Sequence, residues 1–136
     1  MPFVVDASVA AKWILHDEAS ETANALLKTV IRQGAFVPAI FPFEVENVLL
    51  AAQRRGRVDA TSVAEALNLL KHLDLDIEPF LPSQIGRHLE LALRFKLTAY
   101  DAAYLVLSLR RDATLFTADH PLETAAKSLG IGTVLV

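Results

Sequence analysis

Five short apolar segments, placed between longer helical ones, constrain the fold of this 136-residue sequence more than any other feature. Short apolar runs bounded by polar or turn residues are typical of buried strands, and they lie at residues 3–5, 35–37, 75–77, 113–117 and 133–136. Helical patterns fill the intervals, at residues 7–15, 18–31, 42–55, 59–72, 83–95, 99–110 and 119–129. This alternation predicts an α/β fold of three layers, a mainly parallel five-stranded sheet flanked by helices on both faces.

The length and composition of the chain predict one domain, residues 1–136, because no linker or low-complexity tract divides it. The chain has no cysteine, which excludes a disulfide framework and a cysteine zinc site and is typical of a reducing cytosol. Its longest uncharged run, residues 33–43, is far shorter than the ~18 residues of a membrane span. Its first residues lack the basic start of a signal peptide. We therefore expect a cytoplasmic protein that does not enter a membrane.

Three aspartates stand where a parallel sheet places its chemistry, beyond the carboxyl ends of the strands. Asp6 follows the first strand directly, and Asp119 follows the fourth with one residue between. Asp101 lies in the first turn of the apolar helix at residues 99–110. Each also has a purely local explanation, because aspartate is among the preferred residues at helix N-caps.

The choice is sharpest for Asp101, which forms a capping-box pattern with Thr98 before an apolar run. We expect its carboxylate to serve a metal rather than the helix end, because one side chain cannot fully do both. The most polar stripe of that helix contains Tyr104, Leu105 and Ser108, and we expect it to face a wet site.

A fourth acid comes from the helix at residues 42–55, where two glutamates flank the apolar face. Glu44 lies beside small Ala51, whereas Glu46 lies beside polar Gln53. We therefore expect Glu44 to point inward, although exposure to solvent is the commoner fate of a helix charge.

Converging carboxylates need compensation, since two of them at 4 Å repel by about 4 kcal/mol at an effective dielectric of 20. Carboxylates without thiolates or a histidine set favour Mg²⁺ or Mn²⁺, and such a site suits phosphodiester chemistry. The hydroxyls of Ser8 and Thr117 lie two residues from Asp6 and Asp119, where they can orient the ligands.

The ordered motifs VVDAS, PFEVENVL, LTAYDAAYLVL, LFTADHPL and AKSLGI resemble those of PIN-domain ribonucleases, specifically VapC-type toxins of toxin–antitoxin pairs. The resemblance spans nearly the whole chain. It implies a PIN-like fold with a parallel five-stranded sheet, cleavage of RNA with Mg²⁺ or Mn²⁺, a homodimer, and inhibition by a cognate antitoxin. It assigns the acidic quartet to Asp6, Glu44, Asp101 and Asp119, with Ser8 and Thr117 at its hydroxyl positions.

Two other functions remain open from the sequence. One is a catalytically inactive PIN-like module that binds protein or RNA, which the intact quartet disfavours. The other is a metal-dependent phosphatase, which the missing D-x-D after the first strand weakens, since Asp6 is followed by Ala7 and Ser8.

Two features of the composition, its apolar share and its net charge, bear on interactions with partners. The apolar share of 53% is high, so part of the surface is expected in an interface with another chain. The net charge of −3 becomes +1 (−3 + 4) when the four proposed ligands are set aside. Candidate phosphate contacts are Arg54, Arg55, Arg57, Arg87, Arg94, Arg110 and Arg111.

Overall fold

The computed structural model describes residues 2–136, in which strands and helices alternate as the sequence predicts. The strands are β1 (Phe3–Val5), β2 (Ala35–Pro38), β3 (Leu75–Glu78), β4 (Thr114–Thr117) and β5 (Thr133–Leu135). The α-helices are α1 (Ala7–Ile14), α2 (Glu21–Gln33), α3 (Phe41–Arg54), α4 (Ala60–His72), α5 (Arg87–Phe95), α6 (Ala99–Arg111) and α7 (His120–Ser128). Short 3₁₀ turns occupy His16–Glu18 and Pro82–Gln84.

The five strands form one parallel sheet in the order β3-β2-β1-β4-β5. Strand β1 is central, and its Val4 pairs with Phe36 of β2 on one side and with Leu115 of β4 on the other. The chain moves outward from β1 to β3 and then returns to β4 on the opposite side. The topological switch point therefore lies between β1 and β4, where a ligand site is expected in such sheets.

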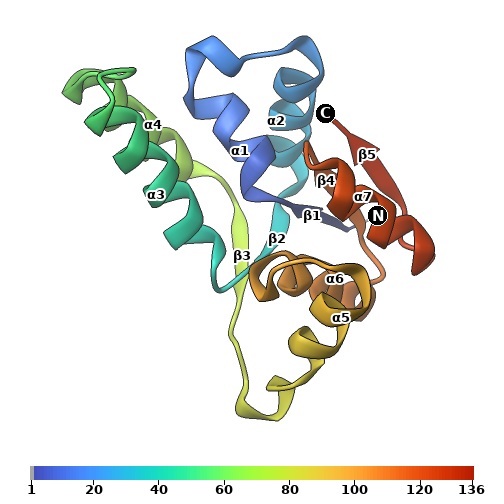
Figure 1. The fold of residues 1–136 in the computed structure, drawn as a ribbon. Helices are drawn as coiled ribbons and strands as arrows, with labels where there is room; N and C mark the ends of the chain where they lie inside the picture. Colours follow the sequence, from blue (N-terminus) through green and yellow to red (C-terminus); the bar gives the residue numbers. More distant parts are fainter. Residues whose placement is uncertain (1) are drawn as a thin grey trace.

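Helices cover both faces of the sheet, which confirms the three-layer α/β prediction. Figure 1 shows α1 and α2 above the sheet, α5 and α6 below it, and α3 and α4 side by side as a pair that projects from it. Helix α6 contacts β1, β2 and β4 and is covered by α5 on its other side. Its middle residues, 104–108, are consequently buried all the way round.

Two helices begin later than the sequence pattern predicts, and polar or glycine residues set their true starts. Helix α2 begins after Ser20, whose hydroxyl accepts a hydrogen bond from Ala23 N at 3.1 Å and caps the first turn. Helix α5 begins after Gly86, whose φ of 103° is open to glycine but strained for other residues. Periodicity alone does not detect such breaks, because the apolar spacing continues across them.

Candidate active site

Asp6 stands at the end of the central strand β1 and is only 5% exposed. It occupies the N-cap position of α1, but its side chain makes no capping hydrogen bond. Instead, Oδ2 accepts protons from the hydroxyls of Ser8 at 2.6 Å and Thr117 at 2.8 Å. Among the described residues, Oδ1 accepts no hydrogen bond. The capping explanation for Asp6 therefore fails, and one oxygen of a nearly buried carboxylate stays available.

The two hydroxyls that hold Asp6 are themselves held by the backbone of the β4–α7 junction. Ser8 Oγ accepts from Ala118 N at 3.0 Å, and Thr117 Oγ1 accepts from Asp119 N at 3.0 Å. Because each hydroxyl receives a backbone N–H, its own proton is directed at Asp6. This network fixes the ends of β1 and β4 against one another across the switch point.

Asp119 follows the same junction and is half-buried. Its Oδ1 caps α7 by accepting from Leu122 N at 3.0 Å, so the local capping explanation holds for this residue. Within residues 2–136, its Oδ2 accepts no hydrogen bond. One carboxylate oxygen is thus left for another partner.

Glu44 lies in the first turn of α3 and is half-buried, whereas Glu46 is exposed, as the helix pattern predicts. Its Oε1 accepts the hydroxyl proton of Tyr104 at 2.6 Å. This places Glu44 toward α6 rather than toward solvent. Tyr104 is a residue of this site that the sequence analysis did not assign to it, although its position one turn after Asp101 was a usable signal.

Asp101 forms the capping box that its sequence pattern suggests. Asp101 N donates to Thr98 Oγ1 at 3.0 Å, and Asp101 Oδ2 accepts from Thr98 N at a long 3.4 Å. The expectation that this carboxylate forgoes capping is therefore wrong for this structure. The second bond is near the limit for a hydrogen bond, and Oδ1 takes no part in the capping box.

The expectation that the stripe of Tyr104, Leu105 and Ser108 faces a wet site is also wrong, because all three side chains are buried. Helix α6 is enclosed between α5 and the sheet, so even its more polar side meets protein. The Tyr104 hydroxyl alone reaches an acid, and Ser108 Oγ bonds to the Tyr104 carbonyl at 2.8 Å within the helix.

Two of the four acids, Asp6 and Glu44, lie close enough to other acids for their pKa values to respond. Burial raises the pKa of Asp6, and the charges of Asp101 and Asp119 raise it further, against the hydrogen bonds from Ser8 and Thr117. Burial likewise raises the pKa of Glu44, with smaller contributions from two of the other acids, while the bond from Tyr104 opposes the shift. The structure therefore brings the four acids into one electrostatic cluster at the carboxyl edge of the sheet.

Each of these acids also lies at the start of a helix. Asp6 and Asp119 precede α1 and α7, and Glu44 and Asp101 lie in the first turns of α3 and α6. Helix N-termini carry partial positive charge and unpaired N–H groups, which stabilise anions. Four such ends around one cluster offset part of the carboxylate repulsion and suit a phosphate group.

The donor chemistry of this cluster fits a divalent cation. Among residues 2–136, each carboxylate uses one oxygen in a hydrogen bond and leaves the other without one. Hard carboxylate oxygens are the ligands that Mg²⁺ and Mn²⁺ prefer. A cation would also relieve the mutual repulsion. In residues 2–136, however, no three acid or histidine side chains lie close enough together to hold an ion as placed. Binding one therefore requires these side chains to approach each other.

Three of the seven arginines considered as phosphate contacts are engaged elsewhere. Arg57 forms a two-pronged pair with Asp17 and a third contact with Glu18 at 3.1 Å. Arg110 and Arg111 both pair with Glu78 at the end of β3. These contacts tie structural elements together, so the sequence-based assignment of these three residues to RNA loses its support.

Comparison with known proteins defines the class of this fold and site. Residues 3–128 match the PIN domain, so the chain belongs to the PIN domain family. PIN domains are generally nucleases, typically dependent on a divalent metal, and the nucleases among them bind RNA.

A solved structure, that of PAE2754 from Pyrobaculum aerophilum, has the same fold. It superposes with a TM-score of 0.72 at 24% identity, over 98% of this chain and 91% of that one. A search of curated proteins finds no match. Among the described residues, no helix is both long and apolar enough to cross a membrane.

Proposed function

We propose that this chain, as a single PIN-like domain over residues 1–136, is an endoribonuclease that depends on Mg²⁺ or Mn²⁺. The observation that carries the proposal is the cluster of carboxylates at the switch point, whose charges raise the pKa values of Asp6 and Glu44. Among residues 2–136, each of the four leaves one oxygen without a hydrogen bond. Asp6, Glu44, Asp101 and Asp119 would hold the metal, and Ser8 and Thr117 would position Asp6.

The residues of the chain prepare the site for an RNA phosphate in three ways. Ser8 and Thr117 fix one oxygen of Asp6, which aims the other away from the network. The N-termini of α1, α3, α6 and α7 supply partial positive charge around the position of a phosphate. The buried position of Asp6 lowers the local dielectric and strengthens these electrostatic effects. The metal, when bound, would neutralise charge on the phosphate and acidify a water molecule.

The decisive experiment compares RNA cleavage by the wild type and by Asp101→Asn with Mg²⁺, with Mn²⁺ and with EDTA. Asp112→Asn is a matched control, because Asp112 is exposed at the opposite end of the same helix. We expect activity in the wild type and the control only with metal, and little in Asp101→Asn. Cleavage that survives EDTA, or equal activity in all three proteins, contradicts the proposal. The absence of cleavage by the wild type under every condition favours the inactive-module alternative.

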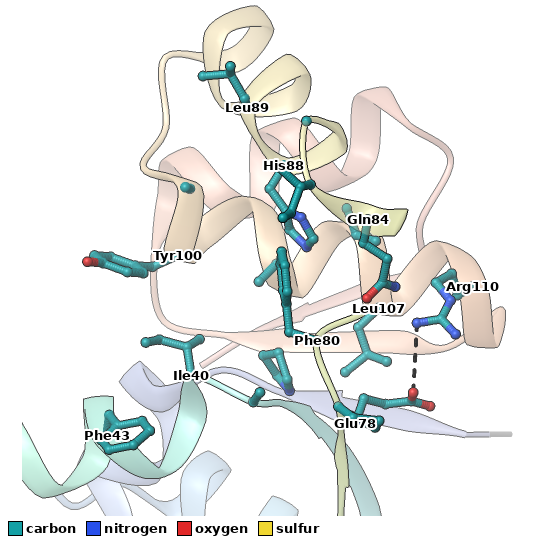
Figure 2. A pocket seen from close by; sticks show the side chains of 18 residues that line it. Ile40, Phe43, Glu78, Phe80, Gln84, His88, Leu89, Tyr100, Leu107 and Arg110 are labelled. Atoms are coloured by element: carbon teal, nitrogen blue, oxygen red, sulfur yellow. Dashed lines mark ion pairs between the residues drawn. The ribbon is translucent and has the colours of Figure 1, made fainter. Parts of the chain in front are cut away.

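We further propose a homodimer, in which a second copy covers an apolar surface beside the acids. This surface surrounds a pocket of about 500 Å³ between α5, α6 and the start of α3 (Figure 2). Its rim residues are each more than half exposed: Phe43, Phe80, Ile85, Leu89 and Tyr100. Exposed apolar patches of this kind are typical of protein interfaces. Phe43 and Tyr100 directly precede Glu44 and Asp101, so the surface adjoins the proposed active site.

The dimer is tested by light scattering on the wild type and Leu89→Arg. Ile31→Arg is a matched control, since Ile31 is exposed to a similar degree and does not line the pocket. We expect a dimer for the wild type and the control and a monomer for Leu89→Arg. A monomeric wild type contradicts the proposed self-association.

A toxin role with a cognate antitoxin completes the proposal. It is supported by the motif resemblance and by a second groove, of about 610 Å³, between α3 and α4. Apolar Leu50, Val63 and Leu67 line that groove, and Phe43 at its end lies next to Glu44. An antitoxin segment in this groove would lie beside the acids. Co-expression with the product of a small adjacent open reading frame should yield a stable complex without nuclease activity, and an unaffected nuclease contradicts this part.

A further inference from the structure

We infer that Tyr104 is a positioning residue that holds Glu44 in place for metal binding. This inference rests on the function proposed above, and it adds a residue that the motif of acids and hydroxyls does not include.

The geometry singles out one side chain. Tyr104 is 0% exposed and lies one turn after Asp101 on α6. Its hydroxyl donates to Glu44 Oε1 at 2.6 Å, across 60 residues of sequence. Among the described residues, this is the one hydrogen bond that the Glu44 carboxylate accepts. Glu44 therefore owes its inward orientation to a single phenol.

The direction of this hydrogen bond follows from its chemistry, because a phenol hydroxyl donates and a carboxylate accepts. Burial and the charges of Asp6 and Glu44 raise the pKa of Tyr104 above its ordinary value. The Tyr104 hydroxyl also lies near Asp6. It therefore lies between Asp6, which follows β1, and Glu44, in the first turn of α3.

The bond has a consequence for the whole cluster. It engages Oε1 and leaves Oε2 of Glu44 free. It also joins the first turn of α3, which holds Glu44, to α6 at a point one turn after Asp101. The relative position of two proposed ligands is thus set by one contact. Without the hydroxyl, we expect this half-buried glutamate, which lies near the negative charges of Asp6 and Asp101, to turn toward water.

The test compares Tyr104→Phe with Ser108→Ala, which also removes one buried hydroxyl from α6. Ser108 lies one turn further along. In the part of the chain that the structure describes, its hydroxyl bonds only to the Tyr104 carbonyl, so we expect loss of this hydroxyl to leave the acids undisturbed. Mn²⁺ affinity is measured by calorimetry on the full chain. We expect Tyr104→Phe to bind roughly 10–100-fold more weakly, as is typical when a residue that orients a metal ligand is lost, and Ser108→Ala to match the wild type.

A second measurement needs no metal. The carboxyl-carbon NMR signal of Glu44 should shift in metal-free Tyr104→Phe and stay unchanged in Ser108→Ala. Adding Tyr104→Phe to Glu44→Ala should weaken Mn²⁺ binding no further, because the phenol acts through Glu44.

The outcomes separate the two proposals. If the wild type binds Mn²⁺ and Tyr104→Phe behaves like Ser108→Ala, the inference is overturned and the proposed nuclease function stands. If the wild type binds no Mn²⁺ and cleaves no RNA, the proposed function fails, and the role of Tyr104 in metal binding fails with it. Equal loss of affinity in both variants indicates a general effect on packing and also overturns the inference.

Discussion

Two buried carboxylates stand at the carboxyl edge of the same sheet, and their surroundings are opposite. Glu78 ends β3 and is 8% exposed, but Arg110 and Arg111 pair with it, and Arg111 also stacks over Phe36 at 4.4 Å. Asp6 follows β1 and is 5% exposed, and it receives two hydroxyls while the nearest charges are other acids.

This difference distinguishes a carboxylate with a structural role from one that is a candidate metal ligand. A buried charge is costly unless it is paired. Glu78 is compensated within the chain, and its role is to join the edge strand to the end of α6. The charge at Asp6 is not matched by any cation of the described residues. That deficit supports the proposal that Asp6 binds a cation supplied from solution.

The largest expected effect comes from removing the uncompensated charge. Asp6→Asn should reduce metal-dependent RNA cleavage by on the order of 100-fold or more, because a ligand that supports several kcal/mol of charge stabilisation is lost. Single-turnover cleavage with Mn²⁺ measures this. Asp76→Asn, at an exposed position of β3, is the control and should retain full activity. A comparable loss of cleavage in both variants would contradict the special role proposed for the uncompensated Asp6 carboxylate.

A smaller effect is expected when the compensated acid is changed. Glu78→Gln leaves two arginines without their charged partner, and we expect the free energy of unfolding to fall by about 2–3 kcal/mol. This is less than the full cost of breaking a buried ion pair, because both arginines are partly exposed. Cleavage per folded molecule should stay unchanged. Urea unfolding together with the cleavage assay checks both. Arg57→Gln, in an exposed ion pair, should lower the free energy of unfolding much less than Glu78→Gln does.

The smallest expected effect is on the pH-dependent stability of the metal-free protein. The pKa of Asp6 is raised by burial and by Asp101 and Asp119, so the folded chain holds a proton more tightly than the unfolded chain, whose aspartate titrates near 3.8. The contribution of Asp6 to stability therefore falls as pH rises from about 4 through the raised pKa, and it stays low above it.

Asp6→Asn removes this penalty, so the metal-free variant should be more stable than the wild type at neutral pH. The advantage should shrink as the solution is acidified toward pH 4. Thermal unfolding in EDTA at several pH values measures it. A variant that is less stable at neutral pH would mean that the hydrogen bonds of Ser8 and Thr117 outweigh the repulsion.

Much of the fold was predictable because its signals are local. The five strands and the alternating helices follow from short apolar runs and helical periodicity, and the N-caps at Asp59 and Asp119 form as their residue types suggest. The starts of α2 and α5 were misplaced, since Ser20 and Gly86 interrupt a spacing that looks continuous. The capping of Asp101 was also predictable from its own turn, and the expectation against it was wrong.

The sequence by itself determined the order of the elements and placed the four acids at helix starts near strand ends, because these properties depend on neighbours within one or two turns. Only the tertiary structure decided which partner each carboxylate takes. Thr117 meets Asp6 across 111 residues, and Tyr104 meets Glu44 across 60. Such pairs exist because β1 and β4 are adjacent in the sheet and α6 packs beneath them, and no local pattern encodes that order of strands.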